Sequence, residues 1–376
     1  MIVAGAGIAG SAVTRVLYEL GFPVVALDKR AQSADAGLAI FLPGNAIAAL
    51  DQLGVWDAVA DVSCPIRSRQ YRTHTDRLLF SVDEVGFWGA RNQPRSLLRA
   101  DLLNLLRGGL PDEAFSYGRE IVSVKQEKRG AVLSLSDGAE VVSDKLIAAD
   151  GVNSVVRASL FPGNHVRNAK LSSFSWRFMV RNPGVDCWTV WLGSRSMVLL
   201  IPVGKDTAYG WATSTFPSSP WTGPRLDPDD FRTFPARVRK AIDSAIASPN
   251  RIYTSKMTEV RMERWSSDKV LLVGDAAHST APVWAQGAAL GLSAALTLRN
   301  LLQVETLRSV TSSWPAILDR FEREQRPRVE HVAAMTDKMS KAARLPLLLR
   351  NLTMPFLGPR TYGATFEPLR TWFSPV

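Results

Sequence analysis

The chain has 376 residues, of which 46% are hydrophobic and 21% charged, a composition that excludes an intrinsically disordered protein. Its net charge of +10 comes from scattered basic residues, which argues against a nucleic-acid-binding protein. No run approaches the roughly 20 apolar residues of a spanning helix, and residue 2 already begins a strand-like run, so we expect a cytoplasmic protein with no membrane span. Cys64 and Cys187 lie far apart without histidines at metal spacing, so we expect no disulfide framework and no metal site.

The first 30 residues predict a strand, a glycine turn, a helix and a second strand. The turn contains Gly5, Gly7 and Gly10, and the second strand ends on Asp28. Such glycines allow a tight turn and close approach of the backbone to a pyrophosphate, while the helix N-terminus offers unpaired N–H groups. An acid 18 residues after the last glycine can accept hydrogen bonds from ribose hydroxyls and would repel a 2′-phosphate. This segment predicts a dinucleotide site for FAD or NAD rather than NADP.

The pattern of predicted secondary structure changes along the chain. Residues 1–66 and 95–166 alternate strands and helices, including the apolar strand KLIAAD that ends on Asp150. Residues 168–218 alternate apolar and polar positions between Gly, Pro and Asn turns, which predicts an antiparallel sheet. We expect helices near 228–246, over 286–304 and over about 312–345.

The stretch VLLVGDAAHSTAPVWAQGAALG, residues 270–291, predicts a second anchor for a long cofactor. A buried strand ends in Gly274 and Asp275, and a new helix begins near Gln286 and Gly287. An aspartate at a strand end can bond a ribityl hydroxyl, and a helix N-terminus stabilises negative charge on a reduced flavin. FAD needs such a second anchor and NAD does not, so the pattern favours FAD.

In combination, these motifs resemble the single-component FAD-dependent aromatic hydroxylases, the para-hydroxybenzoate hydroxylase-like group A flavoprotein monooxygenases. The matching pieces are the GxGxxG turn, the ADGVNSVVR segment with Asp150, the GDAAH segment followed by a proline and QG, and Arg99 at the head of a helix. Three departures stand out, where Ala285 replaces the family's usual glycine, Ala289 its asparagine and Ala294 its acid.

The resemblance implies an α/β fold in which a Rossmann-like FAD-binding domain carries an inserted, mainly antiparallel β-sheet substrate domain and C-terminal helices. We expect the discontinuous FAD-binding domain to comprise residues 1–66, 95–166 and 267–330. The substrate domain would comprise 67–94 and 167–266, followed by a C-terminal helical segment, 331–376.

The resemblance also implies site residues. The expected FAD-binding residues are Gly5, Gly7, Ile8, Ala9, Gly10, Asp28, Lys29, Arg30, Arg99, Asp150, Gly274, Asp275, Pro282, Gln286, Gly287 and Ala288. We expect Arg177, Pro282 and Gly287 to act at the reacting groups, and Trp176, Arg177, Trp191 and Trp211 to line a substrate pocket. Each of these tryptophans could equally be a core residue, and Arg177 could equally form a surface salt bridge. The resemblance assigns His278 to the flavin-binding turn, where a structural role is favoured over that of a general base.

The expected function is that of an FAD-dependent monooxygenase, which uses NADH or NADPH and O2 to hydroxylate or epoxidise an aromatic or conjugated small molecule through a C4a-hydroperoxyflavin. With no second GxGxxG in the sequence, NAD(P)H would bind transiently. One alternative is an oxidoreductase of the same fold that desaturates or reduces its ligand, and another is a non-catalytic ligand-binding flavoprotein. The WxWxIP pattern of flavin halogenases is missing. We expect a monomer or a homodimer.

The tail RLPLLLRNLTMPFLGPR, residues 344–360, is both apolar and basic. That composition is compatible with contact to a membrane surface. Because prolines break helices, however, we expect no long amphipathic helix here, and favour packing across the two domains or in a subunit interface.

Overall fold

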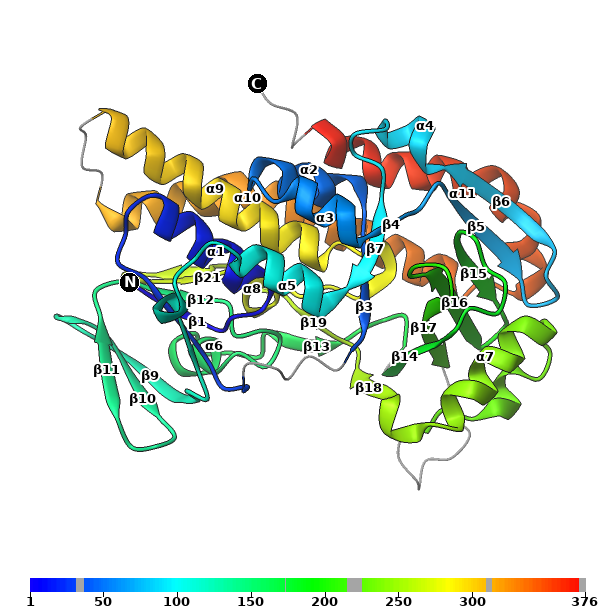
Figure 1. Ribbon diagram of the computed structural model, residues 1–376, viewed down its shortest axis with the longest axis horizontal. Coiled ribbons are helices and arrows are strands. Elements are labelled where there is room, and N and C mark those ends of the chain that lie inside the picture. The colour runs from blue at the N-terminus through cyan, green and yellow to red at the C-terminus, as the bar shows by residue number, and fades with distance from the viewer. Residues whose placement is uncertain (32–36, 173, 215–224, 309–312, 372–376) are drawn as a thin grey trace.

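A computed structural model of the chain describes residues 1–31, 37–172, 174–214, 225–308 and 313–371. Figure 1 shows an elongated molecule, with the N-terminal elements and a three-stranded sheet of residues 121–143 toward one end and a large, mainly antiparallel sheet toward the other. In the part of the chain that the structure describes, no helix is long and apolar enough to cross a bilayer.

The first sheet is mostly parallel and has the order β20-β21-β12-β1-β2-β8. Strand β1 lies between β2 and β12, both parallel to it, and is completely buried, as its uninterrupted apolar sequence predicts. The strands are β1 (Ile2–Ala4), β2 (Val25–Asp28), β8 (Phe115–Tyr117), β12 (Leu146–Ala148), β20 (Ser266–Ser267) and β21 (Val270–Leu272). Because β1, β12 and β21 are parallel, the glycine turn, the Asp150 turn and the Gly274 turn all leave the same edge of the sheet.

Helices cover this sheet. Helix α1 packs on α9 and α5, and the small residues Ala9 and Gly291 let α1 and α9 approach closely. The helices before the C-terminal pair are α1 (Ile8–Glu19), α2 (Gly44–Gln52), α3 (Trp56–Val62), α4 (Glu84–Trp88), α5 (Arg99–Arg107), α6 (Val155–Leu160), α7 (Ala236–Ile246), α8 (Asp275–His278) and α9 (Gly287–Arg308). Short 3₁₀ turns are η1 (Asp112–Ala114), η2 (Pro228–Phe231), η3 (Pro249–Arg251) and η4 (Pro282–Trp284).

The second large sheet has the order β18-β14-β17-β16-β15-β5-β6, and only the β15–β5 pair is parallel among its described strands. Its strands are β5 (Ser68–Thr73), β6 (Leu78–Asp83), β14 (Phe174–Arg181), β15 (Trp188–Leu192), β16 (Ser196–Pro202), β17 (Thr207–Ser214) and β18 (Tyr253–Lys256). Helix α7 packs on one face of this sheet, and the other face looks toward the first sheet.

Three small sheets complete the fold. They contain β3 (Ala39–Leu42), β4 (Cys64–Pro65) and β7 (Arg95–Leu98); β9 (Ile121–Glu127), β10 (Gly130–Leu135) and β11 (Glu140–Ser143); and β13 (Val166–Asn168) with β19 (Thr258–Val260). The α/β class, the antiparallel sheet and the C-terminal helices confirm the expected fold. The division into residue ranges stays a proposal.

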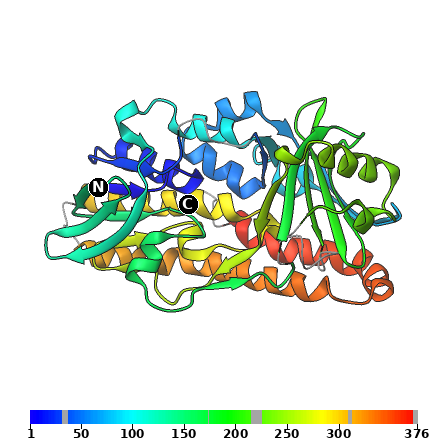
Figure 2. The same ribbon diagram turned by 90° about the horizontal axis from the view of Figure 1, so that it is seen from below.

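The C-terminal helices correct one expectation. Helix α10 (Trp314–Ala342) and helix α11 (Leu347–Thr371) run side by side along the molecule, and α11 continues through Pro355, Pro359 and Pro368 (Figure 2). An interior proline costs a helix about 3 kcal/mol. Burial of Tyr362, Phe366 and Leu369 against β6, α2 and α10 offsets that cost, so the prediction that the prolines would prevent a long helix was wrong.

Candidate active site

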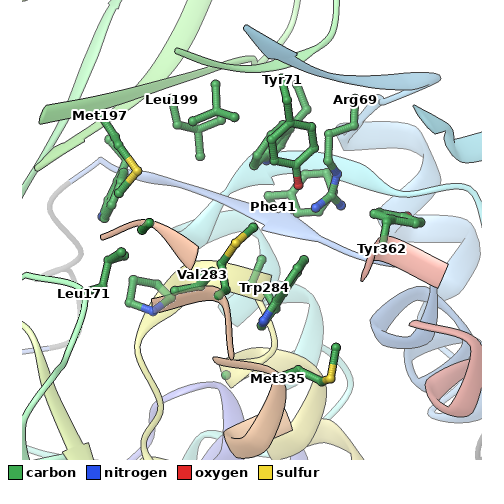
Figure 3. A pocket seen from close by; sticks show the side chains of 18 of the residues that line it. Phe41, Arg69, Tyr71, Leu171, Met197, Leu199, Val283, Trp284, Met335 and Tyr362 are labelled. Atoms are coloured by element: carbon green, nitrogen blue, oxygen red, sulfur yellow. The ribbon is translucent and has the colours of Figure 1, made fainter. Parts of the chain in front are cut away.

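A cavity of about 790 Å³ separates the motif turns of the parallel sheet from the inner face of the seven-stranded sheet. Helices α10 and α11 and the turn η4 close its remaining sides. In Figure 3, Met197, Leu199 and Tyr71 reach in from the sheet, and Leu171, Val283, Trp284 and Met335 face them from across the cavity. The cavity therefore joins residues from both halves of the fold.

The glycine turn after β1 shapes one end of this cavity. Gly5 has a φ of +93°, and a Cβ on Gly10 would lie 1.9 Å from the Gly5 carbonyl oxygen. Both glycines therefore allow tight packing of the turn and do not themselves line the cavity. Gly7, Ile8 and Ala9 do line it, so the N-terminus of α1 faces the open space.

Asp28 ends β2 and is held as a carboxylate. Its oxygens accept hydrogen bonds from the Ala6 N–H (2.8 Å) and from the Arg30 backbone (2.9 Å) and guanidinium (3.0 and 3.1 Å). Burial acts to raise the pKa of Asp28, but these bonds hold the pKa below its usual value. Lys29 is exposed and lies 3.6 Å from Glu120. Asp28, Lys29 and Arg30 do not line the cavity in the described structure.

The Asp150 turn joins β12 to α6. One Asp150 carboxylate oxygen accepts from the Val156 N–H (3.2 Å), and the buried Oδ1 has no hydrogen-bond partner among the described residues. Burial raises the pKa of Asp150. Arg157 donates to the Ala276 carbonyl (2.8 Å) and to the Val152 carbonyl (2.6 Å), which ties this turn to α8. An unsatisfied buried acceptor beside the cavity fits a hydroxyl-bearing cofactor.

Asp275 and two arginines converge from three separate elements. Asp275 begins α8, Arg99 begins α5 and Arg177 lies on β14, and all three line the cavity. The Asp275 side chain is open to the cavity but surrounded by protein, and this burial raises its pKa, while the charges of Arg177 and Arg99 act to lower the pKa. A Cβ on Gly287 would lie 3.8 Å from Asp275 Oδ1, so the carboxylate sits beside the α9 start.

The start of α9 presents backbone rather than side chains. Gly287 and Ala288 line the cavity, as do Pro282 and Gly274. The Gln286 side chain is turned away and exchanges buried hydrogen bonds with Asn45 (2.8 and 3.2 Å). We therefore remove the Gln286 side chain from the cofactor contacts. Asn45, in the first turn of α2, was not predicted from the sequence because it belongs to no recognisable motif.

The three residues that depart from the family pattern, Ala285, Ala289 and Ala294, lie in different structural environments. Ala285 has a φ of 55°, in the left-handed region that favours glycine. Ala289 and Ala294 are fully buried in the main hydrophobic core. Replacement of the polar residues therefore leaves apolar packing at those two positions.

The inner face of the seven-stranded sheet forms an apolar wall. Residues that pair directly across neighbouring strands have side chains on the same face of a sheet. From one strand to the next, the paired residues on the inner face are Arg177, Trp211, Leu199, Val190, Tyr71 and Phe80. All six line the cavity. The wall also includes Met197, Trp188, Ile201 and Tyr209. The last three were not predicted from the sequence, although the alternation of side chains along their strands is the signal that could have found them.

Two of the expected pocket residues, Trp176 and Trp191, point away from the cavity. Trp176 and Trp191 are 1% and 0% exposed and pack beneath α7 on the opposite face of the sheet. Trp176 precedes Arg177 on the same strand, so strand alternation sends their side chains to opposite faces. We correct the expected pocket accordingly, keeping Arg177 and Trp211.

Arg69 and Glu84 form a buried ion pair at one end of the apolar wall, and Arg69 also lines the cavity. The Arg69 Nε lies 2.6 Å from Glu84, and the guanidinium is 4.6 Å from the Trp188 ring centre and 5.2 Å from that of Tyr362. Tyr362 donates to Glu84 (2.6 Å), so α11 is anchored to this pair. Arg69 Nη2, Trp211 Nε1 and Trp284 Nε1 are buried donors of cavity-lining residues without partners among the described residues.

His278 lies outside the cavity lining, at the end of α8. Its ring is 5.1 Å from that of Trp265, and burial lowers the pKa of His278 to about 4. The imidazole is therefore neutral at neutral pH and packs as a core residue.

Comparison with known proteins agrees with this geometry. A family model described as an FAD binding domain matches residues 1–336. The chain belongs to this family. A flavin-dependent monooxygenase of Legionella longbeachae is 25% identical over 313 residues, which are 81% of this chain and 80% of the relative. The 3-amino-4-hydroxybenzoate 2-monooxygenase of Streptomyces cremeus is 28% identical over 360 residues, or 92% of this chain and 87% of the relative.

The fold also matches solved structures. The crystal structure of Klebsiella pneumoniae HpxO complexed with FAD and uric acid superposes with a TM-score of 0.81 at 20% identity, covering 99% of this chain and 95% of that one. The resemblance drawn from the sequence motifs is thus confirmed, and the chain is an FAD-binding flavoprotein of the aromatic hydroxylase family.

Proposed function

We propose that this flavoprotein takes electrons from NADH or NADPH and uses O2 to hydroxylate or epoxidise an aromatic or conjugated small molecule. The observation that carries the proposal is one cavity lined by Asp275, Arg99 and Arg177, with a helix N-terminus on one side and the apolar wall on the other. The names of the relatives, one of which acts on an amino-hydroxybenzoate, support the same chemical class of substrate.

The residues present fit FAD. The N–H groups at the start of α1 would receive the pyrophosphate, and the ionised Asp28 would accept from the adenosine ribose. Asp275 and the unsatisfied Asp150 Oδ1 would accept from hydroxyl groups of the cofactor, with the Gly287 and Ala288 backbone at the flavin end. When bound, FAD supplies the electron transfer and the activation of oxygen.

The chain's own residues would position the substrate and exclude water. Arg177 lies opposite Trp211 on the inner face of the sheet, where its positive charge can hold a phenolate or carboxylate group close to the cofactor. Leu199, Val190 and Phe80 extend the wall with apolar surface that keeps the reacting groups dry. The unpartnered donors of Arg69, Trp211 and Trp284 favour a ligand that carries acceptor oxygens.

The test is NADH and NADPH oxidation by the purified protein with a panel of phenols and aromatic carboxylates under ¹⁸O₂. The proposal expects reductant consumption that depends on the aromatic compound and a product carrying one labelled oxygen. An unlabelled product would support the alternative, a flavoprotein oxidoreductase that desaturates or reduces its ligand. Tight binding of an aromatic compound without turnover would support a non-catalytic ligand-binding flavoprotein.

A further inference from the structure

Exposed apolar side chains concentrate on one short part of the C-terminal region. Of the thirteen large hydrophobic side chains exposed in the described part of the chain, six lie within residues 345–357. Five of them lie on α11 and Leu345 lies just before it. We call this group the α11 apolar face: Leu345, Leu348, Leu349, Leu352, Phe356 and Leu357. Such clustering marks a surface that contacts something other than water.

Three members of the α11 apolar face form a stripe along the helix. Leu348 is 85% exposed, Leu352 70% and Phe356 67%, and their spacing of four residues places them on one side of α11. The opposite side of the helix is packed, with Arg350 buried and donating to the Gly193 carbonyl (2.7 Å). Figure 1 shows α11 at the outer edge of the molecule beside β6.

Basic residues precede and follow this stripe in the sequence. Lys338, Lys341, Arg344 and Arg360 are all exposed, and the sequence has no Asp or Glu from residue 338 to residue 366. An apolar helix face bordered by basic side chains is the pattern of helices that lie in the interface of an anionic bilayer. The neighbouring basic residues therefore distinguish the α11 apolar face from a patch of exposed leucines that has no affinity for anionic groups.

The cavity opens beside the same face. Leu345, Leu357, Lys338 and Arg360 line the cavity and are also exposed, so they form part of its mouth. A surface that covers the α11 apolar face would therefore also adjoin the entrance to the candidate active site.

We propose that the α11 apolar face docks the protein on an anionic phospholipid surface, with the cavity mouth next to the lipid. A second copy of the chain fits this face less well, because a two-fold interface would bring the basic side chains of both copies together. A bilayer instead offers acyl chains to Leu348, Leu352 and Phe356 and phosphate groups to the surrounding lysines and arginines. The docking does not depend on the proposed catalytic function.

The experiment is co-sedimentation of the full chain with phosphatidylcholine vesicles, with and without phosphatidylglycerol. We expect binding to the mixed vesicles that weakens with added salt, and little binding to phosphatidylcholine alone. The double variant Leu348→Ser/Leu352→Ser should bind at least tenfold more weakly, and Lys341→Gln/Arg344→Gln about fivefold more weakly per charge removed. Because these side chains are exposed, the variants are expected to fold, which far-ultraviolet circular dichroism checks.

The control variants make closely similar changes on another surface of the protein. Val122→Ser/Val142→Ser removes two exposed apolar side chains, 51% and 43% exposed, and Lys125→Gln/Lys128→Gln removes two exposed charges. Both controls should bind like the unchanged protein. The proposal is overturned if the unchanged protein does not co-sediment with the mixed vesicles, or if each test variant binds them as strongly as its control does. It is equally overturned if the protein is a dimer that Leu348→Ser/Leu352→Ser dissociates while vesicle binding is absent.

Discussion

Asn45 and Gln286 exchange two buried amide hydrogen bonds although 241 residues separate them in the sequence. The pair joins the first turn of α2 to the residue that precedes α9. Since Gly287 and Ala288 face the cavity from that same helix start, the pair fixes the backbone that we assign to the flavin.

The variant Asn45→Ala should therefore reduce both stability and FAD retention. It leaves the buried Gln286 amide unpaired, which costs about 1–3 kcal/mol of unfolding free energy. Urea unfolding of the apoprotein measures the first effect, and FAD titration the second. Asn250→Ala, at an exposed position in η3, is the control for loss of an asparagine. Unchanged stability and unchanged FAD affinity would show that the pair does not position α9.

The glycine turn predicts a steric effect on cofactor binding. In Gly10→Ala the new Cβ would lie 1.9 Å from the Gly5 carbonyl oxygen, so the turn before α1 must open. We expect purified Gly10→Ala to retain at least tenfold less FAD than the unchanged protein, read from visible absorbance per chain. Gly363→Ala is the control, because a Cβ there meets no atom within 4 Å. Equal FAD content in the two variants would contradict this account of the turn.

His278 predicts how stability depends on pH. Burial lowers its pKa to about 4 in the folded protein, against an ordinary value of 6.5. A depressed folded pKa means that this contribution is complete above pH about 6.5 and is lost as the pH falls toward about 4, by about 3 kcal/mol in total. Unfolding by urea across this range should show that loss in the unchanged protein. His278→Gln should lack it, and a pH dependence that survives the substitution would assign the effect to other groups.

The two faces of the seven-stranded sheet predict different costs for two tryptophans. Trp176→Ala empties a buried site beneath α7 and should cost about 3–5 kcal/mol of unfolding free energy. Trp211→Ala removes a half-buried ring that faces the cavity, and its cost should be at least twofold smaller. Equilibrium unfolding of both variants is the measurement. A larger loss for Trp211 would mean that the cavity wall, rather than the α7 side, carries the core of the sheet.

The local motifs could be predicted from sequence because their chemistry is local. A buried strand leads within two residues to a glycine or an aspartate at Gly5, Asp150 and Gly274, and the rule for parallel strands brings these three turns to one edge of the sheet. The residues Arg99, Asp275 and Gly287 follow from these motifs, and the structure brings them to one cavity.

The rest depends on packing between distant segments. Strand alternation separates Trp176 from Arg177, but only the position of α7 tells which face is buried and which is open. Tyr362 reaches Glu84 across 278 residues, a contact that no sequence spacing reveals. Helix α11 survives its prolines because tertiary burial outweighs local propensity.

The central claim is that one cavity between the two large sheets holds FAD. Absorbance of the freshly purified protein, followed by titration of the apoprotein with FAD, tests it most directly. We predict a yellow protein, and an apoprotein that binds one FAD per chain with recovery of the visible flavin bands. A colourless protein whose apoprotein takes up no FAD would contradict the claim.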